Sequence, residues 1–321
     1  MVVVTGAAGF IGSALVRKLN DEGVEKLILV DEFAAPAKIK NLADKKYCEK
    51  VWREDFFDWL RINHQKVEFI FHLGARTDTA EQDMSVFEKL NVSYSKQVWN
   101  SCSAFNIPLL YASSAATYGD GSRGYDDSHD MVDSLEPLNP YGKSKQIFDQ
   151  WVLKQQDCPP FWAGLKFFNV YGPNEYHKGP MASAIFHLFR QIASDGFVKL
   201  FRSHKEGIKD GEQRRDFIYV KDVVDACFFF YQHQKKSGIY NIGTGDARSF
   251  NELALAVFRA LNKAHDIHFV DTPESIRSNY QYFTQANIAR LRGIGYSKPF
   301  FNLEEGIEDY VKNYLVVEKY Y

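Results

Sequence analysis

The sequence predicts an α/β protein with a doubly wound parallel sheet and a smaller C-terminal lobe interleaved with it. In the first half of the chain, short apolar runs alternate with helical stretches, a pattern typical of β-α-β units. A glycine-rich turn joins the first apolar run to the first helix, as in doubly wound sheets that bind ligands at strand ends. The length of 321 residues also suggests one large or two modest domains.

The first strand is predicted at Val2–Thr5, a run of β-branched residues, and the first helix at 10–20. Pro140 suits the first turn of a later helix that runs towards residue 156. A further helix is expected at 85–105. The remaining apolar runs of this half predict strands at 27–31, 67–73, 109–113 and 161–169.

After residue 170 the alternation is less regular. We expect helices at 181–193, 221–234 and 303–315, a charged loop at 203–215 and a short strand at 216–220, followed by one more strand, helix and loop through residue 284. No repeat and no Gly/Ser- or Pro-rich linker separates the two halves. We therefore expect residues 1–170, with parts of about 216–242, to form the first domain, and residues 171–321 to form most of an interleaved second lobe.

Composition excludes several classes of protein. The 39 Lys and Arg residues against 41 Asp and Glu residues give a net charge of −2, without the basic excess of nucleic-acid-binding proteins. No run approaches the roughly 18 apolar residues of a membrane span, and the N-terminus lacks the features of a signal peptide. The four cysteines are widely spread, which indicates reduced thiols and a cytoplasmic protein. No His, Cys, Asp or Glu cluster has metal-ligand spacing, so we expect no metal.

Gly6, Gly9 and Gly12 follow the first strand directly and open the first helix. Glycines at this spacing permit a tight turn and bring the backbone close to a pyrophosphate, which the free N–H groups of the helix N-terminus bind. The alternative, an ordinary glycine-rich turn, explains the spacing but not its place between strand and helix. This segment predicts a nicotinamide dinucleotide site.

The end of the second strand bears on the phosphate of that dinucleotide. Asp31 lies about 20 residues after the glycines, where an acidic residue binds the ribose 2′-OH and favours NAD. Lys38 and Arg53 lie downstream and offer charges for a 2′-phosphate, or are simply solvated. The small residues Gly74 and Ala75 end another strand, where a cofactor crosses the sheet. Spacing alone leaves NAD and NADP open.

Tyr141 and Lys145 lie one turn apart on the helix that Pro140 begins. A nearby ammonium favours a phenolate, so we expect the lysine to lower the pKa of the tyrosine towards the range useful for acid–base catalysis. Ser114 ends the preceding strand and is placed to bind the same substrate oxygen. Tyr231 and Lys235 share the spacing, but their aromatic helix face favours core packing.

The glycine motif, the serine and the Tyr-x-x-x-Lys pair resemble, in this order, the extended short-chain dehydrogenase/reductase superfamily of sugar-nucleotide epimerases and dehydratases. The resemblance implies a Rossmann-like fold. Dehydratases carry an Asp-Glu pair after the strand serine or threonine, whereas this chain has Ala115 and Ala116, which disfavours elimination of water.

Within this superfamily the chain is most similar to the ADP-L-glycero-D-manno-heptose 6-epimerases. The similarity is carried by residues 111–119, 168–173, 177–183, 215–217 and 280–286. It implies inversion of C6″ of an ADP-heptose, which is a lipopolysaccharide precursor. The implied reaction is a transient oxidation and re-reduction with tightly bound NADP, with NAD as the alternative cofactor. It also implies a cytoplasmic homo-oligomer with no nucleic-acid or membrane partner.

The resemblance implies a set of roles. Tyr141, Lys178, Lys145 and Ser114 are the expected catalytic residues, with Lys178 as the second acid or base. The expected cofactor-binding residues are Gly6, Gly9, Phe10, Ile11, Gly12, Asp31, Glu32, Lys38, Arg53, Leu73, Gly74, Ala75, Arg76, Asn91, Lys145, Val170 and Lys178. The expected substrate-binding residues are Ser114, Asn169, His187, Phe201, Arg215 and Tyr280.

Two departures and two alternatives remain. Pro180 stands where the family has a serine, so a hydroxyl contact is absent, and the 203–215 loop is longer than usual. Another nucleotide-sugar enzyme, such as a UDP-hexose 4-epimerase or a reductase, would share the same motifs. A non-catalytic dinucleotide-binding sensor is the more distant alternative, disfavoured by the intact serine, tyrosine and lysine.

Overall fold

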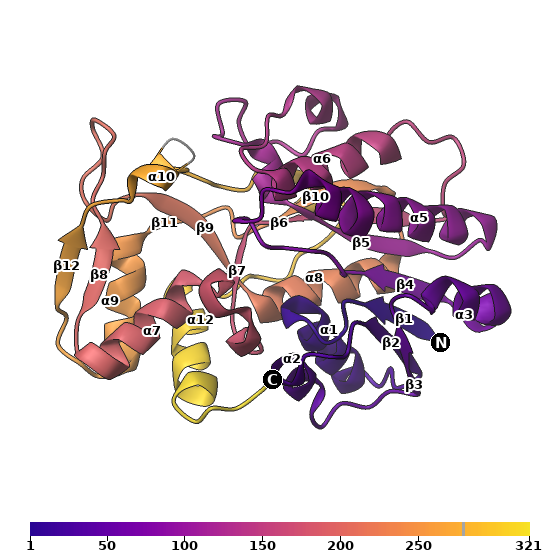
Figure 1. Ribbon diagram of the computed structural model, residues 1–321, viewed down its shortest axis with the longest axis horizontal. Coiled ribbons are helices and arrows are strands. Elements are labelled where there is room, and N and C mark those ends of the chain that lie inside the picture. The colour runs from indigo at the N-terminus through magenta and orange to yellow at the C-terminus, as the bar shows by residue number, and fades with distance from the viewer. Residues whose placement is uncertain (278–279) are drawn as a thin grey trace.

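The computed structural model describes residues 1–277 and 280–321. At its centre is a seven-stranded sheet in the spatial order β10-β6-β5-β4-β1-β2-β3, with every neighbouring pair parallel (Figure 1). The strands are β1 (Val2–Thr5), β2 (Leu27–Asp31), β3 (Glu49–Trp52), β4 (Phe69–His72), β5 (Leu109–Ser114), β6 (Trp162–Phe167) and β10 (Gly238–Ile242). The predicted doubly wound α/β fold is confirmed. The strand order reverses beside β1, where such sheets bind ligands.

Helices cover both faces of this sheet, because alternate strand residues point to opposite sides. Val2 and Val4 of β1 pack with α1 (Phe10–Asp21) and α8 (Val220–His233), whereas Val3 packs with the opposite helices. Those opposite helices are α3 (Phe56–Asn63), α5 (Tyr94–Ala104) and α6 (Pro140–Val152). Both faces are therefore buried, and the strand ends are left for a ligand.

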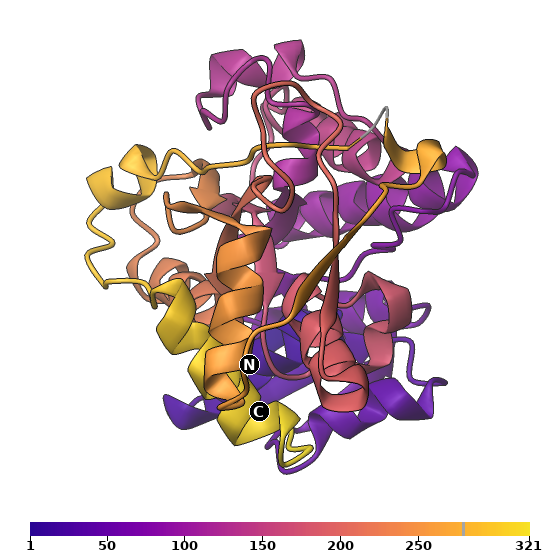
Figure 2. The ribbon, with the colours of Figure 1, turned by 90° about the vertical axis from the view of Figure 1, so that its left-hand side faces the viewer.

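The second lobe contains two small sheets and the helices that cover them. The first sheet has the order β11 (Ala247–Ser249), β9 (Arg214–Tyr219), β7 (Asn169–Tyr171), and the second pairs β12 (Ile267–Val270) with β8 (Val198–Phe201). The helices are α7 (Ala184–Asp195), α9 (Phe250–Ala260) and α12 (Leu303–Tyr310). Figure 2 shows the segment after residue 280 crossing the molecule from α10 (Glu274–Arg277) to α11 (Ala289–Gly293).

The predicted strand at 161–169 is two strands in different sheets. β6 ends at Phe167, the Phe168 N–H donates to the Ile242 carbonyl, and β7 then pairs with β9. The chain therefore passes from the central sheet into the second lobe at this point. The predicted strand at 216–220 begins earlier, because Arg214 and Arg215 already pair with β11.

The predicted helix at 85–105 is interrupted. α4 (Met84–Phe87) is followed by a π-helical turn at Glu88–Ser93 and then by α5. Such turns insert one residue and re-aim side chains, often at functional sites.

The sequence pattern does not predict the strands β3 and β8. β3 has one buried residue and β8 has two, so neither shows a clear apolar pattern. Within the described ranges, none of the helices combines the length and apolar composition that crossing a bilayer requires.

Candidate active site

The glycine turn between β1 and α1 leaves no room for side chains. Gly6 has a φ of 68°, and a Cβ there would lie 2.7 Å from the Gly74 Cα. A Cβ on Gly12 would lie 2.1 Å from the Gly6 carbonyl oxygen. Gly9 caps α1 without a side-chain acceptor, so the N–H groups of the first helical turn stay available. Both the backbone cradle and the open helix end suit a pyrophosphate.

Asp31, at the end of β2, is held from several sides. Its Oδ2 accepts from the Ala8 N–H at 2.8 Å, and its Oδ1 accepts from the Glu32 N–H at 2.7 Å and from the Lys38 ammonium. The structure therefore brings together the predicted residues Asp31, Glu32 and Lys38 beside the glycine turn. The lysine partly offsets the charge of the carboxylate at the place where an adenosine ribose is expected.

Arg53 lies directly after β3, and its N–H donates to the Asp31 carbonyl oxygen at 3.0 Å. Its guanidinium turns to the neighbouring Glu54, with 2.5 Å between Nη2 and Oε1. The backbone of Arg53 thus lies at the predicted place, while its side-chain charge is taken up by an exposed acidic neighbour.

The segment after β4 is clamped to the glycine turn and to α6. The Gly74 N–H donates to the Thr5 hydroxyl oxygen at 3.2 Å. Asn91, on the π-helical turn, accepts from the Arg76 N–H at 2.8 Å and donates to the Arg76 carbonyl oxygen at 3.0 Å and to the Ser144 Oγ at 2.9 Å. Asn91 therefore positions the predicted segment from Leu73 to Arg76, and the π-helical turn places it there.

Ser114, Tyr141 and Lys145 meet where β5 ends against α6. The Lys145 Nζ donates to the Ala112 carbonyl oxygen at 2.8 Å, and the Ser114 Oγ accepts from the Ala116 N–H at 3.1 Å. The Ser114 hydroxyl proton thus remains free to donate, and a hydrogen bond between Ser114 and the Tyr141 phenol lowers the pKa of the phenol. The predicted trio is assembled.

The net shift of the Tyr141 phenol is nevertheless upward, opposite to the expected lowering. Burial is the largest influence on its pKa and outweighs the Ser114 bond. Burial also lowers the pKa of Lys145 to about 8, while Asp149 acts against this shift. The protein by itself therefore favours a neutral phenol, which can donate a proton but must first lose its own proton to act as a base.

Lys178 lies on the 3₁₀ turn Tyr176–Met181 and reaches the cradle. Its Nζ lies 5.1 Å from the ring centroid of Phe10, the first residue of α1. Burial lowers the pKa of the Lys178 ammonium, and the charge of Glu175 opposes this shift. The Glu175 carboxylate is fully buried and accepts from the Ser183 N–H at 2.5 Å and the Ser183 Oγ at 2.7 Å. Glu175 therefore fixes both ends of the turn that carries Lys178.

His187 and Val170 have structural surroundings of their own. The His187 Nε2 lies 3.3 Å from the Pro180 carbonyl oxygen, which links α7 to the Lys178 turn. Val170 is in β7 and packs against the apolar core. Tyr231, from the alternative Tyr–Lys pair, packs against Phe69 with 5.2 Å between ring centroids, as expected for a core residue.

Arg215, Tyr280 and Phe201 gather on the second lobe. The Arg215 guanidinium carbon lies 5.4 Å from the Tyr280 ring centroid, and its Nη2 donates to the Gln281 carbonyl oxygen. The Phe201 and Tyr280 rings meet edge to face at 6.3 Å. We call residues 280–287 the strap. It carries Tyr280 across the face that the predicted substrate residues line.

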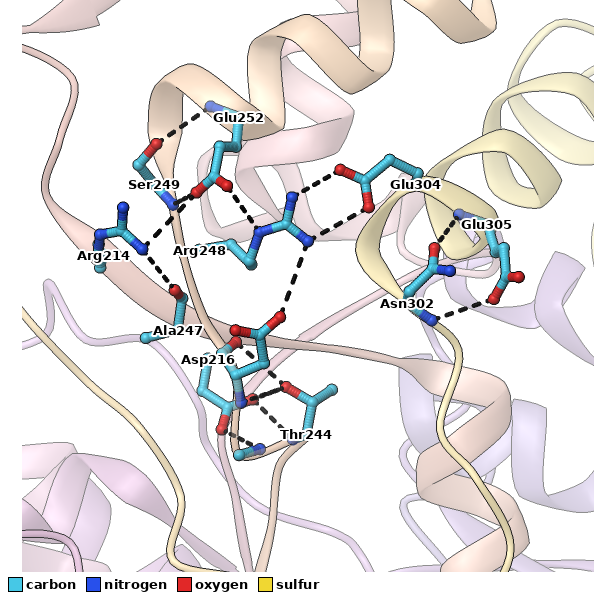
Figure 3. Close-up of polar contacts among 12 residues, drawn as sticks. Arg214, Asp216, Thr244, Ala247, Arg248, Ser249, Glu252, Asn302, Glu304 and Glu305 are labelled. Atoms are coloured by element: carbon cyan, nitrogen blue, oxygen red, sulfur yellow. Dashed lines mark hydrogen bonds and ion pairs between the residues drawn. The ribbon is translucent and has the colours of Figure 1, made fainter.

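Asp216 holds the strap in place. Its Oδ1 accepts from the N–H and hydroxyl of Thr244 at 2.7 and 2.8 Å (Figure 3). Its Oδ2 accepts from the N–H groups of Gly245 and Ala286, both at 2.9 Å. Its own N–H donates to the Thr284 Oγ1, which lies 3.4 Å from the Asn169 Oδ1. Asp216 therefore joins three segments of the chain: β9, the loop at Thr244 and Gly245, and the strap.

Figure 3 also shows the brace behind this arrangement. Arg248 lies between Glu252 of α9 and Glu304 of α12, at 2.9 and 2.6 Å. Ser249 and Asn302 each form a capping box with the glutamate three residues later, which fixes the starts of the two helices. The brace ties the start of α9 to the start of α12.

An open cavity of about 690 Å³ lies beside the strap, lined by Tyr125, Thr244, Phe283, Ala286 and neighbouring residues. None of the predicted site residues lines it. Among residues 1–277 and 280–321, no group of three His, Cys, Asp or Glu residues is arranged to hold a metal ion.

The predicted residues thus form two groups, one around the cradle and α6 and one around Arg215 and the strap. Sequence reasoning missed Asp149, Glu175 and Asp216. A signal exists for Asp149, which lies one turn beyond Lys145 on the face that also carries Tyr141. For Asp216 the only signal is an acidic residue between two arginines and the apolar run 217–220.

Comparison with known proteins places this arrangement in a family. The sequence profile of the NAD dependent epimerase/dehydratase family matches residues 2–243, which is more than half of the chain. The chain belongs to this family. Its fold and the order of its motifs agree with membership, and the second lobe begins inside the matched range.

Relatives within the family extend the similarity to the whole chain. The ADP-L-glycero-D-manno-heptose-6-epimerase of Fusobacterium nucleatum is 48% identical over 331 aligned positions, covering 100% of both chains. The crystal structure of the Helicobacter pylori enzyme of the same name is 29% identical, covers 97% of this chain and 95% of its own, and has a TM-score of 0.80. UDP-glucose 4-epimerase of Thermus thermophilus in complex with NAD is 25% identical, with 97% of each chain covered and a TM-score of 0.75.

Proposed function

We propose that this protein is an isomerase that inverts C6″ of ADP-D-glycero-β-D-manno-heptose to give the L-glycero epimer. The observation that carries this function is the full-length identity of 48% to a heptose 6-epimerase, against 25% to a UDP-glucose 4-epimerase. The gathering of Ser114, Tyr141 and Lys145 at the end of β5 supports catalysis over a sensor role.

The cofactor is a nicotinamide dinucleotide, which when bound supplies a hydride acceptor and donor. The glycine turn fits the pyrophosphate, because Gly6 and Gly12 carry no Cβ and let the backbone segments of the turn lie close together. Asn91 holds the segment from Leu73 to Arg76 in the place where the cofactor crosses the sheet. We propose NADP as the form used, since the Lys38 ammonium beside Asp31 offers a positive charge to a 2′-phosphate.

Tyr141 is proposed to take the proton from the C6″ hydroxyl as the carbinol is oxidised to a ketone, and to return a proton on reduction. Ser114 donates its one hydroxyl proton either to the substrate oxygen or to the phenolate, so it stabilises whichever of the two carries the negative charge. Lys145, whose ammonium lies at the same end of α6, favours the phenolate and is placed to bind the nicotinamide ribose.

Inversion requires that the ketone present its other face, so its oxygen ends at a different position. We propose Lys178 as the acid or base at that second position. Burial lowers the pKa of its ammonium, which makes the proton easier to transfer at neutral pH. Glu175 keeps the turn of Lys178 in register with the cradle through its bonds to Ser183.

The strap is proposed to hold the ADP end of the substrate. Arg215 provides a guanidinium for the diphosphate, and Tyr280 and Phe201 provide aromatic faces beside it. Asn169 and His187 complete the proposed substrate set. The homologue names support a nucleotide-sugar substrate. On the resemblance alone we also propose a role in lipopolysaccharide precursor synthesis and a cytoplasmic homo-oligomer.

The deciding experiment incubates the purified protein with ADP-D-glycero-β-D-manno-heptose without added cofactor and follows the C6″ configuration by NMR. We expect a mixture of both epimers. In a parallel sample, Tyr141→Phe lowers kcat by about 10²–10⁴-fold while the protein keeps its dinucleotide, because the phenol is lost but the cradle is not. The proposal would be overturned if the parent protein did not epimerise the ADP-heptose but did convert UDP-glucose.

A further inference from the structure

A buried ion pair lies directly behind the catalytic trio and has no role in the steps above. Asp149 of α6 and Lys166 of β6 are both fully buried, with 2.7 Å between the Lys166 Nζ and the Asp149 Oδ2. Two hydroxyls also donate to the carboxylate: the Ser113 Oγ to Oδ2 at 2.6 Å and the Tyr111 OH to Oδ1 at 3.1 Å. Burying two charges is costly unless they do something that apolar residues cannot.

The pair reaches Ser114 from both sides. Ser113, the preceding residue, is bonded to Asp149 directly. On the other side, the Lys166 Nζ donates to the Thr117 Oγ1 at 2.7 Å, and the Thr117 hydroxyl donates to the Ser114 carbonyl oxygen at 2.8 Å. The backbone of Ser114 is therefore held between two hydrogen-bonded connections that end on the same ion pair.

The pair also bears on the charge of Lys145. Asp149 lies one turn beyond Lys145 on α6, and its charge opposes the lowering of the Lys145 pKa to about 8 by burial. Around Lys145, β5 presents only the Ala112 carbonyl, and β4 presents His72, whose pKa burial lowers to about 3, so that it is neutral. Tyr141 precedes Lys145 by one turn on α6. Asp149 is thus the anionic group that acts on Lys145.

We propose that Asp149 and Lys166 are positioning residues, which fix Ser114 beside Tyr141 and supply the negative charge that keeps Lys145 an ammonium. This inference rests on the proposed chemistry of the trio but not on the identity of the sugar. Asp149 touches neither substrate nor cofactor and acts through Ser113 and Lys145. Lys166 is the opposite charge that allows the ionised Asp149 carboxylate to remain buried. Its hydrogen bond to Thr117 connects the pair to the Ser114 carbonyl oxygen.

The test uses three variants of the full chain. Asp149→Asn/Lys166→Met removes both charges together, so neither is left buried alone. Ser113→Ala removes one hydrogen bond to Asp149 on the Ser114 side and keeps both charges. Tyr111→Phe is the matched control, since it removes one hydroxyl bond to the same carboxylate but lies away from Ser114.

Two readouts separate geometry from charge. The first is the affinity for NADPH and NADH, measured by fluorescence between about pH 6 and pH 10 on protein freed of its bound dinucleotide. This affinity does not depend on the sugar. The second is kcat and KM with ADP-heptose over the same range. For the double variant we expect affinity and kcat to be lost at a pH lower by about one unit, because Lys145 deprotonates earlier without the nearby negative charge.

We define the alkaline midpoint as the pH at which half of the activity is lost on the alkaline side. For Ser113→Ala we expect kcat to fall about 3- to 10-fold, with KM and the alkaline midpoint unchanged, since one restraint on Ser114 is lost. Tyr111→Phe is expected to leave kcat and midpoint as in the parent. An unchanged alkaline midpoint in the double variant overturns the charge role. Equal kcat values in Ser113→Ala and Tyr111→Phe overturn the positioning role. If the double variant does not fold, this comparison of the two single variants decides the proposal. Failure with ADP-heptose while the NADPH profile shifts would count against the proposed substrate alone.

Discussion

The cradle and the strap solve the same problem, binding one end of an extended ligand, with different parts of the chain. The cradle is backbone: a positive φ at Gly6, and a Gly12 whose missing Cβ lets two backbone segments meet. The strap is one segment, held in place by hydrogen bonds of the buried Asp216, which also binds the loop at Thr244 and Gly245. In the cradle, a substitution that adds a single carbon atom displaces the backbone. Around the strap, a substitution removes only the hydrogen bonds of the side chain that is changed.

The largest effect is expected at the cradle. In Gly12→Ala the added Cβ would lie 2.1 Å from the Gly6 carbonyl oxygen, so the turn must move. We expect loss of the bound dinucleotide and a fall in kcat/KM of at least about 100-fold, since small shifts of positioning elements have effects of this size. Absorbance of the purified protein measures the dinucleotide. Gly293→Ala, a helical glycine with open space around it, is the control and should keep the dinucleotide in full.

The strap should respond differently. Asp216→Asn replaces one acceptor oxygen by an NH₂ group that faces backbone N–H donors, so at least one bond is lost and the strap loosens. We expect KM for the ADP-sugar to rise about 10-fold, with dinucleotide content unchanged. Glu304→Gln makes the same chemical change in the Arg248 brace, and its KM should stay close to that of the parent. If Asp216→Asn instead lost its dinucleotide, the two regions would not be independent.

The same contrast explains what the sequence could predict. The glycine positions, the alternation of strands and helices in the first half and the Tyr141–Lys145 spacing depend on residues close together in the chain, so periodicity and spacing are sufficient to find them. Asp216 binds Thr244 and Ala286, which lie 28 and 70 residues away, and only the folded lobe brings them together. Asn91 lies in a π-helical turn inside a sequence with ordinary helical character, and the turn depends on its tertiary contacts with Arg76 and Ser144.

A smaller effect is expected for Thr284→Val. The Thr284 hydroxyl accepts from the Asp216 N–H at 3.2 Å and lies 3.4 Å from the Asn169 Oδ1, so its loss frees one strap contact and one proposed substrate residue. Steady-state kinetics should show a KM increased about 3-fold and an unchanged kcat. Thr284→Ser keeps the hydroxyl and should behave as the parent. Equal KM values in the two variants would remove Thr284 from the substrate side.

The smallest effect is expected at Pro180, where the resemblance implies a serine. Pro180 is exposed and meets His187 only through its carbonyl oxygen, which a serine also provides. Pro180→Ser should therefore change kcat and KM by less than about 2-fold, as for most surface substitutions. A larger gain in affinity for the ADP-sugar would mean that the missing hydroxyl matters to substrate binding.

The most direct test of the account follows the hydrogen on C6″. ADP-heptose carrying deuterium at that carbon is incubated with the protein in ordinary water, without added dinucleotide, and the product is examined by NMR and mass spectrometry. The account predicts that the epimerised product keeps its deuterium, because the hydride moves to the bound nicotinamide and returns to the same carbon. Replacement of the deuterium by solvent hydrogen, or a requirement for added NADPH at every turnover, would contradict it.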